Sequence, residues 1–471
     1  MIQKRLIDRI AELSRLSVKW EEAQRGAARL VVVTGRRQVG KTFLLAHLVD
    51  GLRRSQTGAR AFMFTALPGA SERQQLEAFG VALREQLDVP FLPDRFDRWD
   101  AALRWLASSA ATTPLLAVLD ELPYLVASTP SLTGHIQQLW DEVRRTMSPP
   151  KLMLVLTGSS VAVMQAMTSS DGALYGRLDD ELRVEPFDLP AAAEVLDRLE
   201  PETVIEAYAA CGGYPHHLLS WDQAASTEDN LARLAFSPGG LLLRNGSQLI
   251  ADVPEDHGYR WTLHAVGSGV HERSQIARST GQRVQRPAEL LIRTNLLRFD
   301  RPLGAPDRAR GRLELTDPFL RCWYELCWAD LEQIEAGFGE RIAAARVPRW
   351  QRHLGWVFEE ESRVDARRRA AAGELPAEAR YGRWWSTRGP QVEIDVLGMV
   401  GGRTVLVGEA RWDARPLGTR TLDELKSKER AAPDPVPQPV LCTWSRGGAE
   451  KGLESAGVRS FTPSDMIVRT S

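Results

Sequence analysis

The strongest chemical signal in the sequence is a short glycine-containing motif near the N-terminus. The pattern GxxxxGKS/T is matched by Gly35-Arg36-Arg37-Gln38-Val39-Gly40-Lys41-Thr42, between an apolar run at 30–34 and a helical run that opens at Phe43. Such glycines let backbone N–H groups turn inward around a phosphate, and the N-terminus of the following helix adds partial positive charge. Lys41 is placed to reach the β- and γ-phosphates, and Thr42 to ligate Mg²⁺. The motif predicts a binding site for ATP and Mg²⁺ that is formed by residues 35–42 together with Phe43.

A second strand end is expected to complete this site. The apolar run at 115–119 leads to Asp120, which could hold Mg²⁺ through water, and to Glu121, which could orient and deprotonate an attacking water. An Asp-Glu pair at a strand end is often only a solvated strand end. Here the pair follows the phosphate motif by about 80 residues, and this spacing favours the functional interpretation.

Two further features concern the γ-phosphate. The run LMLVLTGSS at 152–160 ends in Ser159 and Ser160, and a hydroxyl there could sense the γ-phosphate or cap a helix. Arg177, in the segment LYGR, could spread transition-state charge in a neighbouring site, or form an ordinary surface salt bridge. The sequence leaves both alternatives open for each feature.

The C-terminal part of the chain presents a second pair of carboxylates. Asp395 ends or crosses one expected strand and Glu409 ends the next, so that a hairpin would present the two acids side by side. Arg411 points to the same face as Glu409. Paired carboxylates suit a hard cation such as Mg²⁺, and Glu359 or Glu360 upstream could add a third. The spacing predicts a second metal site.

Residues 259–312 form a strongly basic stretch. They contain eleven arginines and four acids, a local excess of seven positive charges. The sequence predicts a helix, a turn at Gly281 and a second helix, as in a helix-turn-helix. The exposed face of the second helix would carry Arg283, Arg286 and Arg293, which are suited to contacts with DNA phosphates. The alternative is a structural lid or a protein-contact module.

The remaining sequence sets the frame for these residues. Strand-like runs alternate with helical stretches from 29 to about 220, which predicts a parallel sheet covered on both faces. Residues 190–245 are expected to be helical, and the part from 345 onward to open with a helix. Strands are then expected at 384–388, 392–400, 404–412, 439–445 and 459–463.

Bulk properties narrow the class of protein. A chain of 471 residues suggests about three domains. Its formal net charge of -1 excludes a polyanion binder that acts through overall charge. Four scattered cysteines, a charged start and no apolar run near 18 residues predict a cytoplasmic protein without a membrane span.

Taken together, the motifs resemble a known family, the archaeal-type P-loop ATPases of archaea and bacteria. The matching stretches follow one another over nearly the whole chain: Leu6-Ile7-Asp8-Arg9, GRRQVGKT, LDELPYL, LTGSS, LYGR, Gly212-Gly213-Tyr214-Pro215, DPFLRCWYEL at 317–326, and EIDVLG with VLVGEARW. The resemblance implies an α/β fold with an AAA+-like P-loop core and helical lid over 1–245. It further implies a winged helix-turn-helix over 246–330 and a restriction-endonuclease-like α/β domain over 345–471.

The same resemblance implies positions for single residues. Asp8 and Arg9 would lie beside the adenine, and Pro215 would sit in the helical lid near the nucleotide. Arg177 would face the lid or a neighbouring subunit of a homo-oligomer.

The C-terminal block resembles the PD-(D/E)xK nucleases, with Asp395 as the first acid and Glu409-Ala410-Arg411 as the ExK element. It departs from the pattern because Arg411 stands where a lysine is expected, and a guanidinium group cannot give up a proton near neutral pH. Lys426 or Lys428 could take the role of that lysine, or could line a solvated helix face. The departure leaves cleavage of DNA open.

The leading hypothesis is an ATP-dependent switch or motor that acts on DNA and carries a nuclease-like effector domain. The alternative is a regulatory ATPase. It would use its nucleotide state to open or close the later domains around a protein partner, without cutting DNA.

Overall fold

The computed structural model describes residues 6–55, 58–88, 92–93, 95–251, 253, 258–281, 283–306, 308–386 and 391–469. The chain divides into two compact units, Met1–Pro186 and Phe187–Ser471. This division leaves the three domains expected from the sequence untested, so their boundaries stay a prediction. Within the described part of the chain, no helix combines the length and the apolar character that a membrane crossing requires.

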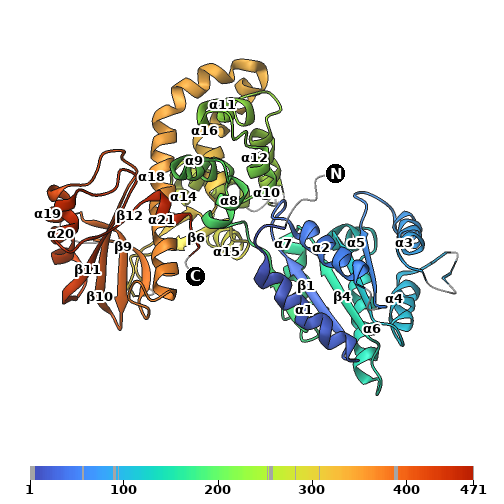
Figure 1. The fold of residues 1–471 in the computed structure, drawn as a ribbon. Helices are drawn as coiled ribbons and strands as arrows, with labels where there is room; N and C mark the ends of the chain where they lie inside the picture. Colours follow the sequence, from blue (N-terminus) through green and yellow to red (C-terminus); the bar gives the residue numbers. More distant parts are fainter. Residues whose placement is uncertain are drawn as a thin grey trace. The chain divides into compact units, whose positions relative to one another are not determined.

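A five-stranded parallel sheet forms the centre of the first unit (Figure 1). In spatial order its strands are β2 (Arg60–Thr65), β3 (Leu115–Asp120), β4 (Leu152–Thr157), β1 (Arg29–Thr34) and β5 (Asp180–Arg183). Every residue of β3 and β4 is buried, so the centre of the sheet is covered on both faces. The predicted α/β class and the four predicted strands are confirmed. The sequence gives no signal for β5, because its residues DELR contain no apolar run.

Helices cover this sheet and build its core. Their bounds are α1 (Ile10–Gln24), α2 (Lys41–Arg54), α3 (Glu72–Gln86), α4 (Trp99–Ser109), α5 (Leu122–Ser128), α6 (Leu132–Arg145) and α7 (Val161–Thr168). An aromatic cluster joins β2 to α3 and α4, where the Phe79 ring meets the rings of Phe62, Phe64 and Trp99 edge-on at 5.3, 5.5 and 5.3 Å. These contacts pack α3 and α4 against β2.

The second unit begins with a group of helices. They are α8 (Leu189–Val195), α9 (Pro201–Cys211), α10 (Pro215–Ser220), α11 (Thr227–Leu234), α12 (Leu241–Ala251), α16 (Pro318–Leu326) and α17 (Leu331–Gln333), with short turns at Trp328–Asp330 and Ile334–Phe338. The predicted helical character of 190–245 is confirmed.

Two motifs that lie far apart in the sequence meet within these helices. The hydroxyl group of Tyr214 donates a hydrogen bond to Asp317, which in turn caps α16 by accepting from the Leu320 N–H at 3.0 Å. A Cβ on Gly213 would lie 2.0 Å from the Phe187 carbonyl oxygen, so only glycine fits at that position. The GGYP and DPFL segments are therefore structural partners.

Three helices and a hairpin follow along the chain. They are α13 (Tyr259–Gly267), α14 (Arg273–Thr280) and α15 (Gln285–Arg293), then the antiparallel strands β6 (Leu297–Asp300) and β7 (Arg312–Leu315). The predicted helix, turn and second helix are confirmed, and Gly281 ends α14 with a φ of +67°. Arg283 lies just before α15, whereas the sequence placed it on the face of that helix.

A mixed five-stranded sheet occupies the C-terminal part. In spatial order its strands are β12 (Arg459–Phe461), β11 (Pro435–Ser445), β10 (Arg403–Arg411), β9 (Glu393–Val400) and β8 (Arg380–Trp385), with helices α19 (Thr419–Ala431), α20 (Lys451–Ser455) and α21 (Pro463–Met466). The five predicted strands are confirmed, although β8 begins earlier than expected and the last two residues of 384–388 lie outside the described residues. Asp395 lies near the start of β9, not at its end.

A single helix, α18 (Gly339–Ala371), connects the helical part of the second unit to this sheet (Figure 1). It contains 33 residues and packs against α9 and α16 as well as against β8, β9 and β10. The C-terminal sheet therefore packs on the same helix that packs against the helical part of the second unit.

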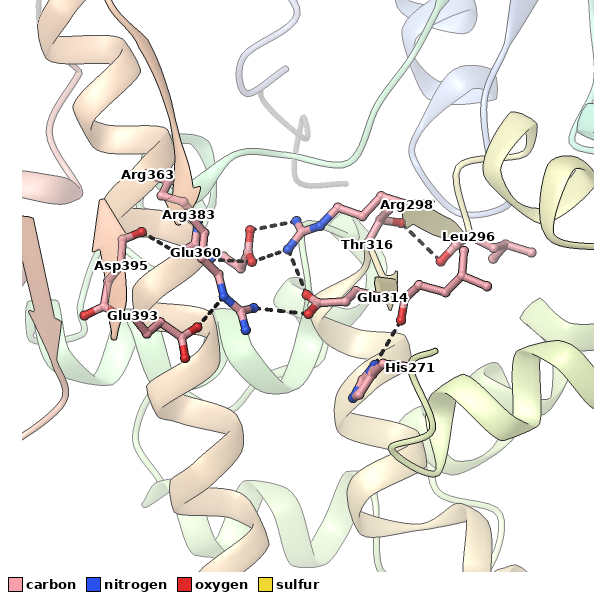
Figure 2. Close-up of polar contacts among 11 residues, drawn as sticks. His271, Leu296, Arg298, Glu314, Thr316, Glu360, Arg363, Arg383, Glu393 and Asp395 are labelled. Atoms are coloured by element: carbon pink, nitrogen blue, oxygen red, sulfur yellow. Dashed lines mark hydrogen bonds and ion pairs between the residues drawn. The ribbon is translucent and has the colours of Figure 1, made fainter. Parts of the chain in front are cut away.

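Five charged side chains, which we name the charge cluster, lie where α18, the β6–β7 hairpin and β8 meet (Figure 2). They are Arg298 of β6, Glu314 of β7, Glu360 and Arg363 of α18, and Arg383 of β8. Arg298 contacts Glu360 at 2.7 Å and Glu314 at 3.2 Å, and Arg383 reaches the other oxygen of Glu314 at 3.1 Å. Arg363 closes the group with a 2.5 Å contact to Glu360. The cluster ties the three elements together.

The charge cluster extends to the start of β9. Arg363 donates to the carbonyl oxygen of Asp395 at 2.8 Å, and Arg383 donates to Glu393 at 2.5 Å. Burial raises the pKa of Glu360, but Arg363 and Arg298 outweigh this effect and hold the pKa well below its usual range. Glu360 is therefore ionised and paired at neutral pH.

We predict that Glu360→Gln destabilises the second unit at pH 7 by about 3–5 kcal/mol, because removing one partner leaves buried charge unpaired. The pKa of Glu360 is lower in the folded protein than in the unfolded chain, where it is near 4.5. Its ionised form therefore contributes its full stabilisation above pH of about 4.5, and this contribution is lost as the pH falls toward the folded pKa. The difference from wild type should therefore shrink below pH of about 4.5, as measured by calorimetry at pH 7 and pH 3.5.

Glu378→Gln provides the control, because Glu378 is an exposed acid of the same unit and its change should stay within about 0.5 kcal/mol. A Glu360→Gln protein as stable as this control at pH 7 would contradict the prediction.

Candidate nucleotide and metal-ion sites

The loop between β1 and α2 depends on three residues in left-handed backbone conformations. Gly35, Gln38 and Gly40 have φ angles of +150°, +65° and +96°. A Cβ on Gly35 would lie 2.4 Å from the carbonyl oxygen of Val184, so only glycine fits there. Turns of this kind orient successive N–H groups into a concave anion-binding surface. The loop therefore has the backbone shape that the predicted phosphate chemistry requires.

Lys41 is the first residue of α2 and is only 5% exposed. Its Nζ donates hydrogen bonds to the carbonyl oxygens of Gly35 and Arg36, both at 2.8 Å. These bonds hold the ammonium group against the loop, next to the partial positive charge of the helix N-terminus. The charge of Lys41 and the partial charge of the helix N-terminus act at the same place, which favours binding of a phosphate group.

Oxygen atoms from three elements converge at the carboxyl end of β3. Thr42 of α2 and Thr65 of β2 donate from their hydroxyl groups to Asp120 Oδ2, at 3.0 and 3.3 Å. Asp120 is 1% exposed, and burial raises the pKa of its carboxyl group. Hydroxyl and carboxylate oxygens are the ligands that Mg²⁺ prefers, so this group can hold a hard cation.

Glu121 lies beside Asp120 in a left-handed conformation, with φ +54° and ψ +44°. Its Oε2 accepts hydrogen bonds from the Ser159 hydroxyl at 3.0 Å and from the Ser159 N–H at 3.3 Å. A non-glycine residue in this region costs about 1–2 kcal/mol, and such strain concentrates at functional sites. β3 and β4 are neighbours, and their ends bring Glu121 and Ser159 together, a contact that the sequence analysis did not predict.

Arg9 links the N-terminal segment to the phosphate loop. It is 4% exposed, and its guanidinium group donates to the carbonyl oxygens of Val39 at 3.0 Å and Glu185 at 2.7 Å. It also pairs with Glu12 at 2.9 Å. Asp8 and Arg9 have φ angles of +59° and +68°, so this segment is held in an unusual conformation. Arg9 braces the loop, whereas the expected place of both residues beside an adenine stays a prediction.

The other residues predicted at the nucleotide are less constrained. Arg177 forms a two-point ion pair with Asp141, with both N–O distances at 2.9 Å, which matches the salt-bridge alternative. Its role in a neighbouring site stays a prediction. Phe43 is 41% exposed on α2, and Pro215 opens α10 in the second unit. Contacts of these two residues with a nucleotide also stay predictions.

In the C-terminal sheet the predicted acid pair lies on neighbouring strands. β9 and β10 are antiparallel with Gly408 opposite Val396, and this register places Glu409 beside Asp395. Both acids are nearly buried, at 8% and 9% exposed, and the Ala410 N–H donates to Asp395 Oδ2 at 3.0 Å. Burial and the neighbouring Glu409 raise the pKa of Asp395 to about 6. The geometry brings together the two predicted carboxylates.

Two cations meet the Glu409 carboxylate. Arg411 contacts its Oε1 at 3.2 Å, and Lys428 of α19 forms an ion pair with its Oε2. Arg411 also pairs with Glu424 of α19. Lys426 is exposed and Lys428 is not, so of the two lysines only Lys428 reaches the acid pair.

The third carboxylate expected from α18 is not brought into a common ligand group. Glu360 turns to Arg298 and Arg363 in the charge cluster. Glu359 is close enough to Asp395 for burial and that neighbour to raise its pKa to about 8. Among the described residues, no group of three or more His, Cys, Asp or Glu side chains is arranged to hold a metal ion. Any cation at this second site would depend on the acid pair and water.

Comparison with protein families identifies both regions. Residues 6–220 match a family described as "ATPase domain predominantly from Archaea", which includes the phosphate loop, Asp120, Glu121 and Ser159. The chain contains an archaeal-type ATPase domain. Residues 323–429 match a family described as "Archaea bacterial proteins of unknown function", and this range includes Asp395, Glu409 and most of α19. A comparison with curated proteins finds no match.

Several solved structures are similar to the chain. The Walker-type ATPase of Pyrococcus abyssi is 19% identical over 68% of this chain and 97% of its own, with a TM-score of 0.49. The ORC2 protein of Aeropyrum pernix, in complexes with ADPNP and ADP, is 12% identical over 74% and 97%, with a TM-score of 0.43. The ORC1 protein of Aeropyrum pernix in complex with DNA is 16% identical over 73% and 95%, with a TM-score of 0.37. These scores lie below 0.5, so the site rests on the residues of this chain.

The arginines that follow the ATPase domain divide into two groups. Arg283, Arg286 and Arg293 are exposed at and on α15, as predicted. Arg298 instead belongs to the charge cluster, and Arg312 lies over the Trp385 ring at 5.0 Å. The local positive excess is therefore partly neutralised by acids from outside the segment.

Sequence reasoning missed partners that come from distant elements. Thr65 reaches Asp120 from β2, and the segment that supplies it carries no recognised motif. Glu424 and Lys428 lie on the same face of α19 as the buried residues Thr421 and Leu425, at helical spacing. That spacing is the signal that could have placed Lys428 toward the sheet.

We predict that Ser159→Ala slows ATP turnover by about 10- to 100-fold, because a hydrogen bond to a charged group is worth about 1.5–3 kcal/mol. The variant should bind ADP as wild type does, since the hydroxyl group donates to Glu121, the residue predicted to act on the attacking water. Steady-state ATP hydrolysis and ADP titration measure the two quantities.

Ser160→Ala is the matched control, because Ser160 precedes α7 without a side-chain cap. Equal rates for the two variants would remove the proposed role of the Ser159 hydroxyl.

Proposed function

We propose that the protein is an ATP-hydrolysing, Mg²⁺-dependent switch or motor that acts on DNA. The carrying observation is the ATPase domain, whose phosphate loop, Asp120 and Glu121 meet at one edge of the parallel sheet. In this proposal the residues Gly35–Thr42 bind the phosphates, as their left-handed turns and the buried Lys41 support.

The proposed reaction assigns one task to each polar residue. Thr42 and Asp120 hold Mg²⁺, which neutralises charge on the β- and γ-phosphates when bound. Lys41 contacts the same phosphates as a point charge. Glu121 orients the attacking water and accepts its proton, and Ser159 fixes the Glu121 carboxylate. Arg177 would leave Asp141 to reach a neighbouring site if the chain forms a homo-oligomer.

We propose three functional domains along the chain. Residues 1–245 are an AAA+-like core with a helical lid, and 246–330 a winged helix formed by α13–α15 and the β6–β7 hairpin. Residues 345–471 are a nuclease-like α/β domain. Three helices followed by a two-stranded hairpin, and an acid pair on adjoining strands, support these assignments.

DNA is proposed as the partner of the winged helix. Arg283 and Arg286 are exposed where α15 begins, and Arg293 is exposed near its end. A helix N-terminus with arginines suits phosphate contacts, which fix position on a duplex without reading its sequence. The Asp395–Glu409 pair would hold a divalent cation close to the bound strand.

A second candidate function is a regulatory ATPase that binds a protein partner and does not cut DNA. It is favoured by the ion pairs at Glu409, because both oxygens of this acid already meet cations. ATPase stimulation by DNA, with salt-sensitive binding, supports the first candidate. Absence of both supports the second.

We predict that Lys41→Ala weakens ATP binding by at least about 100-fold, because it removes a charge-assisted contact to the phosphates. Glu121→Gln should bind ATP as wild type does but hydrolyse it at least about 100-fold more slowly, since the general base is lost. Calorimetric titration with ATP and Mg²⁺, followed by single-turnover hydrolysis, measures both effects.

Lys19→Ala serves as control, because Lys19 lies in the same unit and pairs with Glu22 on the surface of α1. Tight ATP binding by Lys41→Ala would contradict the assignment of the phosphate loop.

For DNA, we predict that the double substitution Arg283→Ala and Arg286→Ala lowers the slope of log affinity against log salt by about 2. Each lost phosphate contact accounts for about 0.9 of this slope. The affinity is measured by fluorescence anisotropy with a duplex of about 30 base pairs, at salt concentrations between about 50 and 200 mM.

The matched variant carries Arg341→Ala and Arg352→Ala, two exposed arginines of α18. Identical slopes for the two double variants would move the DNA contact away from α15, and no binding by wild type would favour the protein-partner candidate.

A further inference from the structure

The acid pair of the C-terminal sheet is accompanied by two cations that are held in different ways. Arg411 lies between two carboxylates, Glu409 on its own strand and Glu424 on α19. Lys428 forms an ion pair with Glu409 and lies near Asp395, but its ammonium group has no second hydrogen bond or ion pair among the described residues. The guanidinium group is anchored from two sides, whereas the ammonium group is held from one.

The position of Lys428 is set by the packing of α19 onto the sheet. Thr421 and Leu425 are buried on the same helical face, and this places Lys428 over β10. Its side chain is 19% exposed, and that of Glu409 is 10% exposed. Lys426, two residues earlier on the same helix, is exposed. The helix therefore aims one of its two neighbouring lysines at the acid pair.

We propose that Lys428 is the catalytic cation of a phosphodiester-hydrolysing site formed with Asp395 and Glu409, and that Arg411 only anchors Glu409 to α19. This inference rests on the proposed nuclease-like domain. In this proposal Lys428 of α19 supplies the positive charge that a lysine on strand β10 would provide in the nuclease pattern. The acid pair fits a divalent cation by its donor atoms, because two nearly buried carboxylates lie on adjoining strands.

In the proposed hydrolysis step each charged group has one task. When Glu409 turns to a divalent cation, the ammonium group of Lys428 is released to the scissile phosphate. A water oxygen then forms the new bond to phosphorus as one bridging P–O bond breaks. The water loses one proton to solvent, and the leaving oxygen takes one up. Lys428 stabilises the negative charge that develops on the phosphoryl oxygens.

Arg411 cannot perform this task from its present place. Moving it to a phosphate would break its contacts with two carboxylates, Glu409 and Glu424. A guanidinium group in a two-sided ion pair serves as a fixed brace, whereas an ammonium group on a flexible stem can change partners.

The test compares cleavage of supercoiled plasmid by the full chain, with Mg²⁺ or Mn²⁺ and with or without ATP. The variants are Lys428→Ala, Lys426→Ala, Asp395→Ala, and Lys428→Ala combined with Arg411→Lys. Lys428→Ala should cut at least about 100-fold more slowly, as expected for loss of one charge-stabilising donor. Lys426→Ala should match wild type, and Asp395→Ala should not cut.

Rescue separates catalysis from structure. A lysine at 411 returns an ammonium group to the acid pair, so the double variant should regain at least about tenfold in rate over Lys428→Ala. Calorimetric titration with Mn²⁺ in the absence of DNA gives a readout that does not depend on cleavage. Lys428→Ala should bind Mn²⁺ at least as tightly as wild type, because a competing cation is gone, while Asp395→Ala should lose binding.

Two outcomes overturn the inference and can be told apart. If wild type cuts and Lys428→Ala cuts equally fast, or if its loss is not rescued by Arg411→Lys, Lys428 has no catalytic role although the nuclease-like domain stands. If wild type neither cuts DNA nor binds Mn²⁺ through Asp395, the proposed nuclease-like function itself fails, and Lys428 with it.

Discussion

The second unit depends on a small group of oppositely charged side chains that are removed from solvent as pairs. The charge cluster joins a helix, a hairpin and a sheet edge, and its acids are ionised only because arginines face them. Ion pairs of this kind add little net stability compared with apolar packing, but they penalise any arrangement that separates the partners. The cluster therefore acts chiefly on geometry. It fixes α18, the β6–β7 hairpin and β8 relative to one another within the unit.

The ATPase domain uses a different constraint, which is backbone conformation. Gly35, Gln38, Gly40 and Glu121 take left-handed conformations at the ends of two strands of one sheet. Each departs from what a regular strand or helix would give, and together they turn polar groups toward one edge. Strained backbone of this kind persists only where the surrounding structure enforces it. Here the fully buried strands β3 and β4 and the hydrogen bond from Arg9 to the loop provide that support.

The sequence allowed most elements to be predicted, because apolar runs mark buried strands and glycines mark the phosphate loop. The strand β5 was not predictable, since DELR has no apolar period and pairs only with β1 at the edge of the sheet. Charge counting also failed for Arg298. Its partners Glu314 and Glu360 lie 16 and 62 positions later, outside the basic stretch 259–312. Local patterns report burial well, but they do not report which distant charges meet.

The site predictions divide in the same way. The acid pair was predictable because two strands of a hairpin bring residues at short separation together. The cation opposite them was left ambiguous, since Lys426 and Lys428 look alike in a charged stretch. Only the register of α19 on the sheet distinguishes them, and register depends on packing that composition does not reveal. Arg411 shows the converse, because the residue at the motif position is tied to Glu424 of α19 as well as to Glu409.

The charge cluster also bears on how such a chain can diversify over evolutionary time. Its members come from β6, β7, α18 and β8, so they span the boundary between the β6–β7 hairpin and the C-terminal sheet. A recombination event that replaced one segment with a foreign one would leave buried acids or arginines without partners. The two segments should therefore be inherited as one block, whereas the first unit contributes none of the five cluster residues and is free of that restriction.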